Sequence, residues 1–203
     1  MTAKNSIAII EDHPIMREGL AAWFTATGRW RVTGKASSLQ KARELLSNPG
    51  FQADVLLLDI QLEDGWGIDI IPWIANQKNP RPAVLAVYSA FDDYAHVSAA
   101  LAAGVRAYVC KRSGEPELEE ALEKALCGEI YVDDTIQARL KNIADVFDTL
   151  TRRETEILSL VKNALSNRQI AAHLGISVRT VENILSCIYG KTGIGSRAEL
   201  QKL

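Results

Sequence analysis

The chain has 203 residues, of which 47% are hydrophobic and 24% are charged, and its formal net charge is −2. These proportions are typical of folded globular protein and exclude a largely disordered chain, and the length allows one medium domain or two small ones. We expect no transmembrane segment, because no apolar run approaches the roughly 18–20 residues that cross a bilayer. The N-terminal residues lack the apolar core and cleavage site of a signal peptide, and three widely spaced cysteines predict neither a metal site nor a disulfide framework.

The first 128 residues alternate between short apolar runs and helix-like segments. The apolar runs predict strands at Ile7–Ile10, Val55–Leu58, Val84–Tyr88 and Val105–Cys110, with a weaker strand at Arg31–Ala36. The other segments predict helices at His13–Thr27, Leu39–Ser47, Ile68–Asn76, Asp93–Ala103 and Pro116–Cys127. Five strands alternating with five helices predict an α/β fold, a doubly wound parallel sheet covered on both faces.

Acidic residues follow two of these predicted strands. Glu11 and Asp12 end the first apolar run, and Asp59 ends the run Val55–Leu58. In open parallel sheets, ligands bind beyond the carboxyl ends of the strands, so the three acids are expected to converge on one crevice. Alternatively, each acid merely begins a loop, and Asp12 could cap the helix that Pro14 opens. Three acids at two strand ends favour a shared site.

Clustered carboxylates predict a magnesium site, because Mg²⁺ prefers hard oxygen ligands and offsets their mutual repulsion. A carboxylate in such a site can act as a nucleophile toward a phosphoryl group and form an acyl phosphate. That reaction also needs a cation for the developing charge and a hydroxyl group for a phosphate oxygen. The sequence offers both after predicted strands, because Ser89 follows "LAVY" and Lys111 follows "AYVC".

Residues 5–128 resemble the receiver domain of two-component response regulators. The resemblance is carried by "IIED", "LLLDIQLEDGWG", "VYSA" and "GVRAYVCK", in this order and spacing. It implies that Asp59 is the phosphoacceptor, that Lys111 pairs with the phosphoryl group, and that Ser89 and Tyr108 are switch residues. It also implies that Mg²⁺ is held by Glu11, Asp12, Asp59 and the backbone carbonyl of Gln61.

The chain departs from the receiver pattern at three places. Glu11 replaces the commoner Asp, and Arg112 stands where many receivers have Pro. Glu63 replaces a Pro four residues after the phosphoacceptor, and Asp64 follows it. Two extra acids beside the site are expected to weaken the approach of an anionic phosphodonor.

Charge is distributed unevenly along the chain. Residues 1–148 contain 15 Lys and Arg against 21 Asp and Glu, or −6, whereas residues 149–203 contain 8 against 4, or +4. This indicates two domains with different partners, although chance variation in surface charge would give similar totals. Residues 129–148 are predicted to be a linker or joining helix. Basic residues neutralise phosphates, so the C-terminal domain is a candidate for nucleic-acid binding.

Residues 149–203 predict a small all-α domain of four short helices. These are expected at Arg153–Lys162, Asn167–His173, Val178–Tyr189 and Arg197–Leu203. Ser166 or Asn167 can cap the second helix, Gly175 ends it, and Ser177 caps the third. Two helices joined through "HLGIS" predict a helix-turn-helix, whose second helix can enter a major groove. A small helical bundle that does not bind DNA is the alternative.

The same segment resembles the LuxR-type DNA-binding domain through "LTRRE", "LSNRQIAAHLGIS" and "RTVENI". Its pairing with a receiver resembles the NarL/FixJ family of transcription regulators. By that resemblance the recognition helix is Val178–Tyr189, where Asn183 can read adenine and Glu182 can accept a hydrogen bond from cytosine N4. The expected DNA contacts are Arg168, Ser177, Val178, Arg179, Thr180, Glu182, Asn183, Ser186 and Lys191. The expected phosphate contacts are Arg152, Arg168, Arg179, Lys191 and Arg197.

Together the resemblances imply a cytoplasmic response regulator and not an enzyme. A sensor histidine kinase would phosphorylate Asp59 with Mg²⁺ as cofactor, and the active protein would bind double-stranded promoter DNA as a homodimer, away from membranes. One alternative, motivated by Glu63 and Asp64, is a DNA-binding regulator whose receiver is not controlled by phosphorylation. Another is an aspartyl-nucleophile phosphohydrolase, but Gln61 stands where such enzymes need an acid and cannot transfer a proton.

Overall fold

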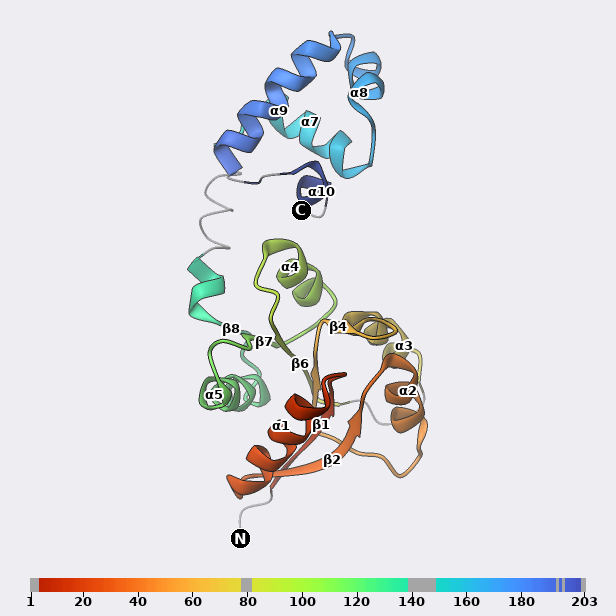
Figure 1. The fold of residues 1–203 in the computed structure, drawn as a ribbon, viewed down its shortest axis with the longest axis vertical. Coiled ribbons are helices and arrows are strands. Elements are labelled where there is room, and N and C mark those ends of the chain that lie inside the picture. The colour runs from red at the N-terminus through yellow and green to blue at the C-terminus, as the bar shows by residue number, and fades with distance from the viewer. Residues whose placement is uncertain (1–3, 78–81, 139–148, 193, 195, 202–203) are drawn as a thin grey trace. The chain divides into compact units, whose positions relative to one another are not determined.

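The structure is a computed structural model that describes residues 4–77, 82–138, 149–192, 194 and 196–201. The chain divides into two compact units, Met1–Ile136 and Gln137–Leu203 (Figure 1). The first unit therefore extends past residue 128, into the segment predicted as a linker. Residues 139–148 of that predicted linker lie outside the described residues.

The first unit is built on a parallel sheet with the strand order β2-β1-β3-β6-β7-β8. Every pair of neighbouring strands is parallel. The strands are β1 (Asn5–Ile10), β2 (Trp30–Ala36), β3 (Val55–Leu58), β6 (Val84–Ser89), β7 (Ala107–Cys110) and β8 (Tyr131–Val132). This confirms the predicted doubly wound sheet and adds β8 at one edge. Two residues are too few to show a strand periodicity, so β8 could not be recognised from the sequence.

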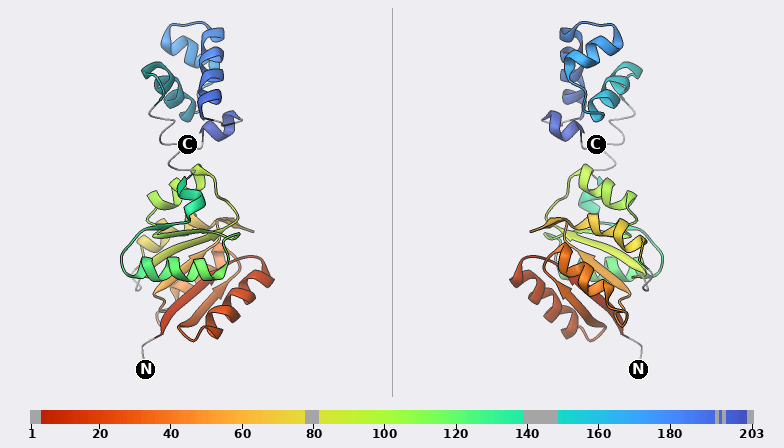
Figure 2. Two further views of the ribbon diagram at one scale, coloured as in Figure 1. Left: turned by 90° about the vertical axis from the view of Figure 1, so that its left-hand side faces the viewer. Right: turned by 90° about the vertical axis from the view of Figure 1, so that its right-hand side faces the viewer.

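Helices cover both faces of this sheet. They are α1 (Pro14–Ala26), α2 (Leu39–Ser47), α3 (Ile70–Ala75), α4 (Tyr94–Ala102) and α5 (Glu115–Leu126). Helices α1 and α5 pack on one face, and α2, α3 and α4 lie on the other (Figures 1 and 2). Ile7 and Ile9 belong to the same buried cluster as Phe24 of α1 and Leu118 of α5. Because alternate strand residues point to opposite faces and both faces are covered, β3 and β7 are apolar and buried along their whole length.

The chain order places four strand ends beside one another. From β1 the chain crosses to β2 on one side, and it returns to β3 on the other side of β1. Ile10 pairs with Leu58, Leu58 pairs with Val87, and Ser89 pairs with Cys110. The residues that follow β1, β3, β6 and β7 therefore emerge at the same edge of the sheet, where the strand order reverses.

A short hairpin follows β3. Strands β4 (Gln61–Leu62) and β5 (Gly65–Trp66) pair antiparallel and lead into a 3₁₀ turn, η1 (Gly67–Asp69), before α3. Gly67 lies so close to the backbone of Asp59 that a Cβ atom there would meet the Asp59 carbonyl oxygen at 1.9 Å. The Gly67 amide donates to the Ile60 carbonyl at 2.7 Å. A glycine is therefore required here for steric reasons.

The second unit is helical, as predicted. It contains α7 (Arg152–Lys162), α8 (Asn167–Leu174), α9 (Val178–Thr192) and α10 (Arg197–Gln201). Its core includes Ile157, Val161, Ile170, Val181, Leu185, Ile188 and Leu200. Ser166 caps α8 by accepting from the Gln169 amide, Gly175 ends α8 with a left-handed φ of 64°, and Ser177 accepts from the Thr180 amide at 3.0 Å. Among the described residues, no helix has the length and apolar character to span a membrane.

Glu154 connects the start of α7 to the end of α9. Its Oε2 accepts from the Thr151 amide at 2.7 Å and completes a capping box with the Thr151 hydroxyl. The same oxygen lies 2.7 Å from Nζ of Lys191. The hydrogen bonds from Lys191 and from Thr151 lower the pKa of Glu154 from an ordinary 4.5 to about 2.

We expect acid to weaken this connection. Because the folded-state pKa of Glu154 is depressed, its stabilisation is complete above about pH 4.5 and is lost as the pH falls toward 2. Glu154→Gln retains a capping-box acceptor but removes the charge, so it should cost about 0.5–1 kcal/mol at neutral pH. Thermal unfolding followed by circular dichroism between pH 2 and 7 should show that the stability of Glu154→Gln depends less on pH than that of the parent. Glu156→Gln should have the same pH dependence as the parent. A Glu154→Gln curve parallel to the parent curve would contradict this assignment.

Candidate functional site

The acids predicted to share a site do lie together at the carboxyl edge of the sheet. Glu11 follows β1, Asp59 follows β3, Ser89 ends β6 and Lys111 follows β7. Glu11 and Asp59 are 2% and 6% exposed. An open cavity of about 400 Å³ lies over this edge, and Asp12, Asp59, Gln61, Ser89 and Lys111 are among the residues that line it.

Lys111 bridges the two buried carboxylates. Its Nζ lies 2.7 Å from Oε2 of Glu11 and 2.6 Å from Oδ2 of Asp59. Burial favours the neutral amine, but hydrogen bonds and charge from Asp59 and Glu11 outweigh it, so the pKa of Lys111 is raised. The ammonium is therefore a fixed positive charge next to Asp59.

Ser89 holds the other oxygen of Asp59. Its hydroxyl is fully buried and donates to Oδ1 of Asp59 at 2.7 Å, and the Ile60 amide donates to the same oxygen at 2.7 Å. Both carboxylate oxygens of Asp59 thus accept hydrogen bonds, one from Lys111 and the other from Ser89 and the backbone. The predicted nucleophile, hydroxyl and cation are brought together as the sequence suggested.

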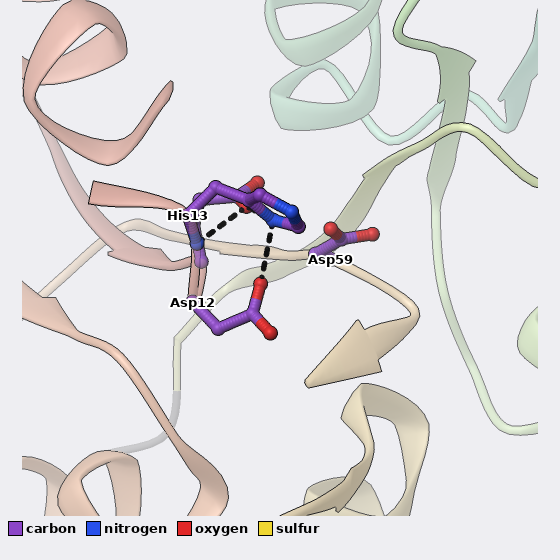
Figure 3. A group of neighbouring side chains, drawn as sticks. Asp12, His13 and Asp59 are labelled. Carbon is purple, nitrogen blue, oxygen red and sulfur yellow. Dashed lines mark hydrogen bonds and ion pairs between the residues drawn. The ribbon is translucent and has the colours of Figure 1, made fainter. Parts of the chain in front are cut away.

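Asp12 and His13 complete the acidic side of the cavity (Figure 3). His13 Nδ1 lies 2.8 Å from Oδ1 of Asp12 and 3.0 Å from Oε1 of Glu11. The contact with Asp12 lacks hydrogen-bond geometry, and among the described residues no other group bonds to this buried oxygen. Glu11, Asp12, His13 and Asp59 each offer one ligand atom within 4.8 Å of the others. Carboxylate oxygens so close together, one of them unsatisfied, fit a divalent cation.

His13 was missed in the sequence, although it directly follows the acidic pair. It also occupies the N-cap position of α1, where its side chain makes no capping hydrogen bond. The alternative that Asp12 caps this helix is therefore wrong, because the cap position is one residue later. Gln61 lines the cavity from β4, and the role of its backbone carbonyl as a metal ligand stays a prediction.

The two acids of the β4–β5 hairpin differ in their surroundings. Glu63 lines the cavity and is exposed. The carboxylate of Asp64 instead accepts from the backbone amides of Leu39 at 2.7 Å and Gln40 at 2.9 Å, at the start of α2. Glu63 therefore carries its charge at the cavity itself, whereas the charge of Asp64 is partly offset by the amides of α2.

Tyr108 is fully buried in β7, three residues before Lys111. Its hydroxyl donates to the carbonyl oxygen of Phe91 at 2.7 Å, in the loop that follows Ser89. Burial and the carboxylates of Asp93 and Asp59 raise the pKa of this phenol. Tyr108 thus contacts the segment that would move if Ser89 moved.

In the second unit, α9 has one buried and one exposed face. Val181, Leu185 and Ile188 are buried in the core. Seven predicted DNA contacts lie on the exposed side or directly before the helix: Ser177, Val178, Arg179, Thr180, Glu182, Asn183 and Ser186. Arg168 is exposed on α8. All eight residues are therefore exposed on the helix-turn-helix, and their contacts with DNA stay predictions.

Two predicted phosphate contacts have partners within the second unit. Lys191 pairs with Glu154, as described above, and also donates to the Thr149 carbonyl at 3.3 Å. Arg197 donates to Oδ1 of Asn167 at 2.7 Å and to the carbonyl of Leu165. DNA contacts by these two cations stay predictions, and such contacts would have to compete with these internal bonds.

Comparison with known proteins identifies both units. Residues 7–123 match the response regulator receiver domain, and residues 148–203 match the luxR family of bacterial regulatory proteins. The chain therefore belongs to the response regulators and pairs a receiver with a LuxR-type domain, which confirms the predicted NarL/FixJ-type organisation.

Relatives and solved structures share this organisation over nearly the whole chain. The response regulator protein VraR of Staphylococcus aureus is 29% identical, over 98% of this chain and 94% of its own length. The response regulator ChrA of a heme-sensing two-component system is also 29% identical, with a TM-score of 0.53 over 98% of this chain and 94% of that one. RcsB of Salmonella enterica serovar Typhimurium, solved bound to promoter DNA with the phosphomimetic BeF₃⁻, has the same fold, with a TM-score of 0.72 at 23% identity over 98% of this chain and 97% of that one.

Removing Lys111 tests the electrostatics of the site. Lys111→Met leaves Glu11 and Asp59 buried without their cation, which should cost about 3–5 kcal/mol without divalent metal. Mg²⁺ should restore part of the lost stability. It should also bind to Lys111→Met more tightly than to the parent, because the ammonium no longer competes for the carboxylates. Urea unfolding with and without Mg²⁺ measures both effects, with Lys41→Met on α2 as the control. An equal loss under both conditions would show that the carboxylates do not share a cation site.

Proposed function

We propose that this chain is a phosphorylation-controlled transcription regulator. A sensor histidine kinase transfers a phosphoryl group to Asp59, and the helix-turn-helix of α8 and α9 binds double-stranded promoter DNA in the cytoplasm. The observation that carries the proposal is the placement of Asp59 in an open cavity, bonded to both Lys111 and Ser89. Family membership supports the same assignment.

The acidic cluster suits the Mg²⁺ that this reaction requires. Glu11, Asp12 and Asp59 would hold the ion together with the backbone carbonyl of Gln61, and the unsatisfied Oδ1 of Asp12 supports this assignment. When bound, Mg²⁺ supplies positive charge that attracts the phosphoryl oxygens and offsets the charge that develops during transfer.

Transfer itself uses groups already in contact with Asp59. One carboxylate oxygen forms a bond to phosphorus while the bond between phosphorus and the donor's histidine nitrogen breaks. The ammonium of Lys111 and the hydroxyl of Ser89 now bond to the carboxylate at 2.6 and 2.7 Å. Lys111 bonds to Oδ2 and Ser89 to Oδ1, and each can exchange its carboxylate oxygen for an oxygen of the new phosphoryl group, because hydrogen bonds to a charged acceptor are stronger.

The same exchange provides a signal. Movement of Ser89 toward the phosphoryl group carries the following loop with it, including the Phe91 carbonyl to which Tyr108 donates. Phosphorylation thereby shifts a pre-existing equilibrium of the receiver toward a state that releases the DNA-binding helix or favours a homodimer. A homodimer would present two copies of α9 to paired half-sites.

The alternative of a receiver that ignores phosphorylation loses part of its basis. It rested on Glu63 and Asp64 together, and the charge of Asp64 is engaged by backbone amides of α2. Tryptophan fluorescence distinguishes a receiver controlled by phosphorylation from one that is not. Trp66 can report on the site because it lies on the hairpin beside the cavity and is 42% exposed. If neither Mg²⁺ nor beryllofluoride changes the tryptophan fluorescence, the alternative is favoured.

Asp59→Asn should abolish phosphoryl uptake from acetyl phosphate, because an amide oxygen is a poor nucleophile although it retains hydrogen-bond acceptance. The fold should survive, and circular dichroism checks this. Asp69→Asn changes an exposed acid of the neighbouring turn and should be phosphorylated as the parent. Phosphate-affinity electrophoresis measures the phosphorylated fraction, and normal uptake by Asp59→Asn would refute the site assignment.

Two exposed residues of α9 should affect DNA binding differently. Arg179→Ala should weaken binding to all sequences and reduce the dependence of log affinity on log salt by about one. Glu182→Ala should instead relax selectivity at one base pair by about 1–3 kcal/mol, because a carboxylate can accept from a base but is repelled by phosphate. Selection of genomic fragments should identify a binding site, and fluorescence anisotropy titrations at several salt concentrations then measure affinity and base selectivity separately. Arg43→Ala in the receiver is the control and should change neither.

A further inference from the structure

We propose that Asp64 is a positioning residue for phosphoryl transfer to Asp59. Its carboxylate holds the β4–β5 hairpin against the start of α2, and the hairpin in turn fixes the segment that runs from Asp59 to Gly67. This inference rests on the proposed function, because it names a residue that shapes the same site.

The contact is a helix cap supplied from 25 residues away in the chain. Oδ1 of Asp64 accepts from the amide of Leu39 at 2.7 Å, and Oδ2 accepts from the amide of Gln40 at 2.9 Å. These amides belong to the first two residues of α2, which have no acceptor within the helix. Ser38, the local cap, accepts instead from the amide of Lys41 at 3.2 Å. The two caps therefore serve different amides.

The charge of Asp64 is well compensated at this position. Burial opposes ionisation, but hydrogen bonds from the Gln40 and Leu39 amides outweigh it and lower the pKa of Asp64. The positive end of the helix dipole also favours a carboxylate here. The hairpin is thus held by a charged group that remains ionised across the physiological pH range.

Close packing accompanies this contact. Gly65 has a φ of 150°, and a Cβ atom there would lie 2.8 Å from Cδ1 of Leu39. Leu39 itself is 5% exposed. The turn of the hairpin therefore lies directly against the first residue of α2 and leaves no space for a side chain at position 65.

The other end of the hairpin is joined to the phosphoacceptor. Gln61 pairs with Trp66, and the Gly67 amide donates to the Ile60 carbonyl at 2.7 Å. Gly67 also lies against the carbonyl of Asp59, as described above. A hairpin released from α2 would be free to shift Gln61 and the backbone that follows Asp59. Small displacements of groups that orient a metal ligand or a nucleophile reduce metal affinity and rate substantially.

The sequence provides matched controls on both sides of this contact. Glu63 is the adjacent acid on the same hairpin, but it faces the cavity. Ser38→Ala removes the local cap of α2 and leaves Asp64 in place. A variant of Ser38 therefore weakens α2 alone, whereas a variant of Asp64 weakens α2 and releases the hairpin.

The test measures Mg²⁺ affinity by isothermal titration calorimetry, the initial rate of phosphoryl uptake from acetyl phosphate, and the melting temperature of the full chain. Asp64→Ala should lower Mg²⁺ affinity and uptake rate by about tenfold, and Asp64→Asn, which retains one acceptor oxygen, should recover part of both. Ser38→Ala should lower the melting temperature but leave Mg²⁺ affinity unchanged, and Glu63→Ala should not slow uptake.

Three outcomes would overturn the proposal. These are an Asp64→Ala protein with parental Mg²⁺ affinity and uptake, equal effects of Ser38→Ala and Asp64→Ala on Mg²⁺ affinity, and no recovery in Asp64→Asn. Failure of the proposed function is distinguishable, because the parent protein would then take up no phosphoryl group while its Mg²⁺ affinity still reported on Asp64.

Discussion

Two buried carboxylates, those of Glu11 and Asp59, share the single ammonium group of Lys111. Like charges at this distance in a partly dry environment repel strongly, and a cation between them converts the repulsion into attraction. The arrangement requires that β1, β3 and β7 deliver their next residues to one edge, which the strand order provides. Ser89 donates to the same Asp59 carboxylate, so its hydrogen bond belongs to this charge balance.

The β4–β5 hairpin shows how a receiver can keep acidic residues near an acidic site. Glu63 and Asp64 are neighbours in sequence, yet one borders the cavity and the other binds two backbone amides of α2. The negative charge of Asp64 is thereby partly offset by the dipoles of these amides. Counting charges near Asp59 along the sequence overestimates the repulsion that a phosphodonor meets.

A similar argument applies to the basic second unit. The net charge of +4 over residues 149–203 made this unit a candidate for nucleic-acid binding, but Lys191 and Arg197 are bonded to groups of the same unit. The exposed face of α9 carries Arg179 together with the acid Glu182. General attraction to phosphate would therefore rest on the other cations of the unit, of which Arg168 and Arg179 are exposed.

The sequence by itself determined the order of the longer strands and helices, the end of α8 at Gly175, the cap at Ser177, and the convergence of acids at one sheet edge. Hydrophobic periodicity and capping are local signals, and parallel strands always share their carboxyl edge. Tertiary structure alone decided the partner of Asp64, the pairing of Lys191 with Glu154, and the place of His13 beside the acids. Strands of two residues, such as β4, β5 and β8, leave no periodicity, and contacts between residues far apart in the chain depend on how the folded elements pack.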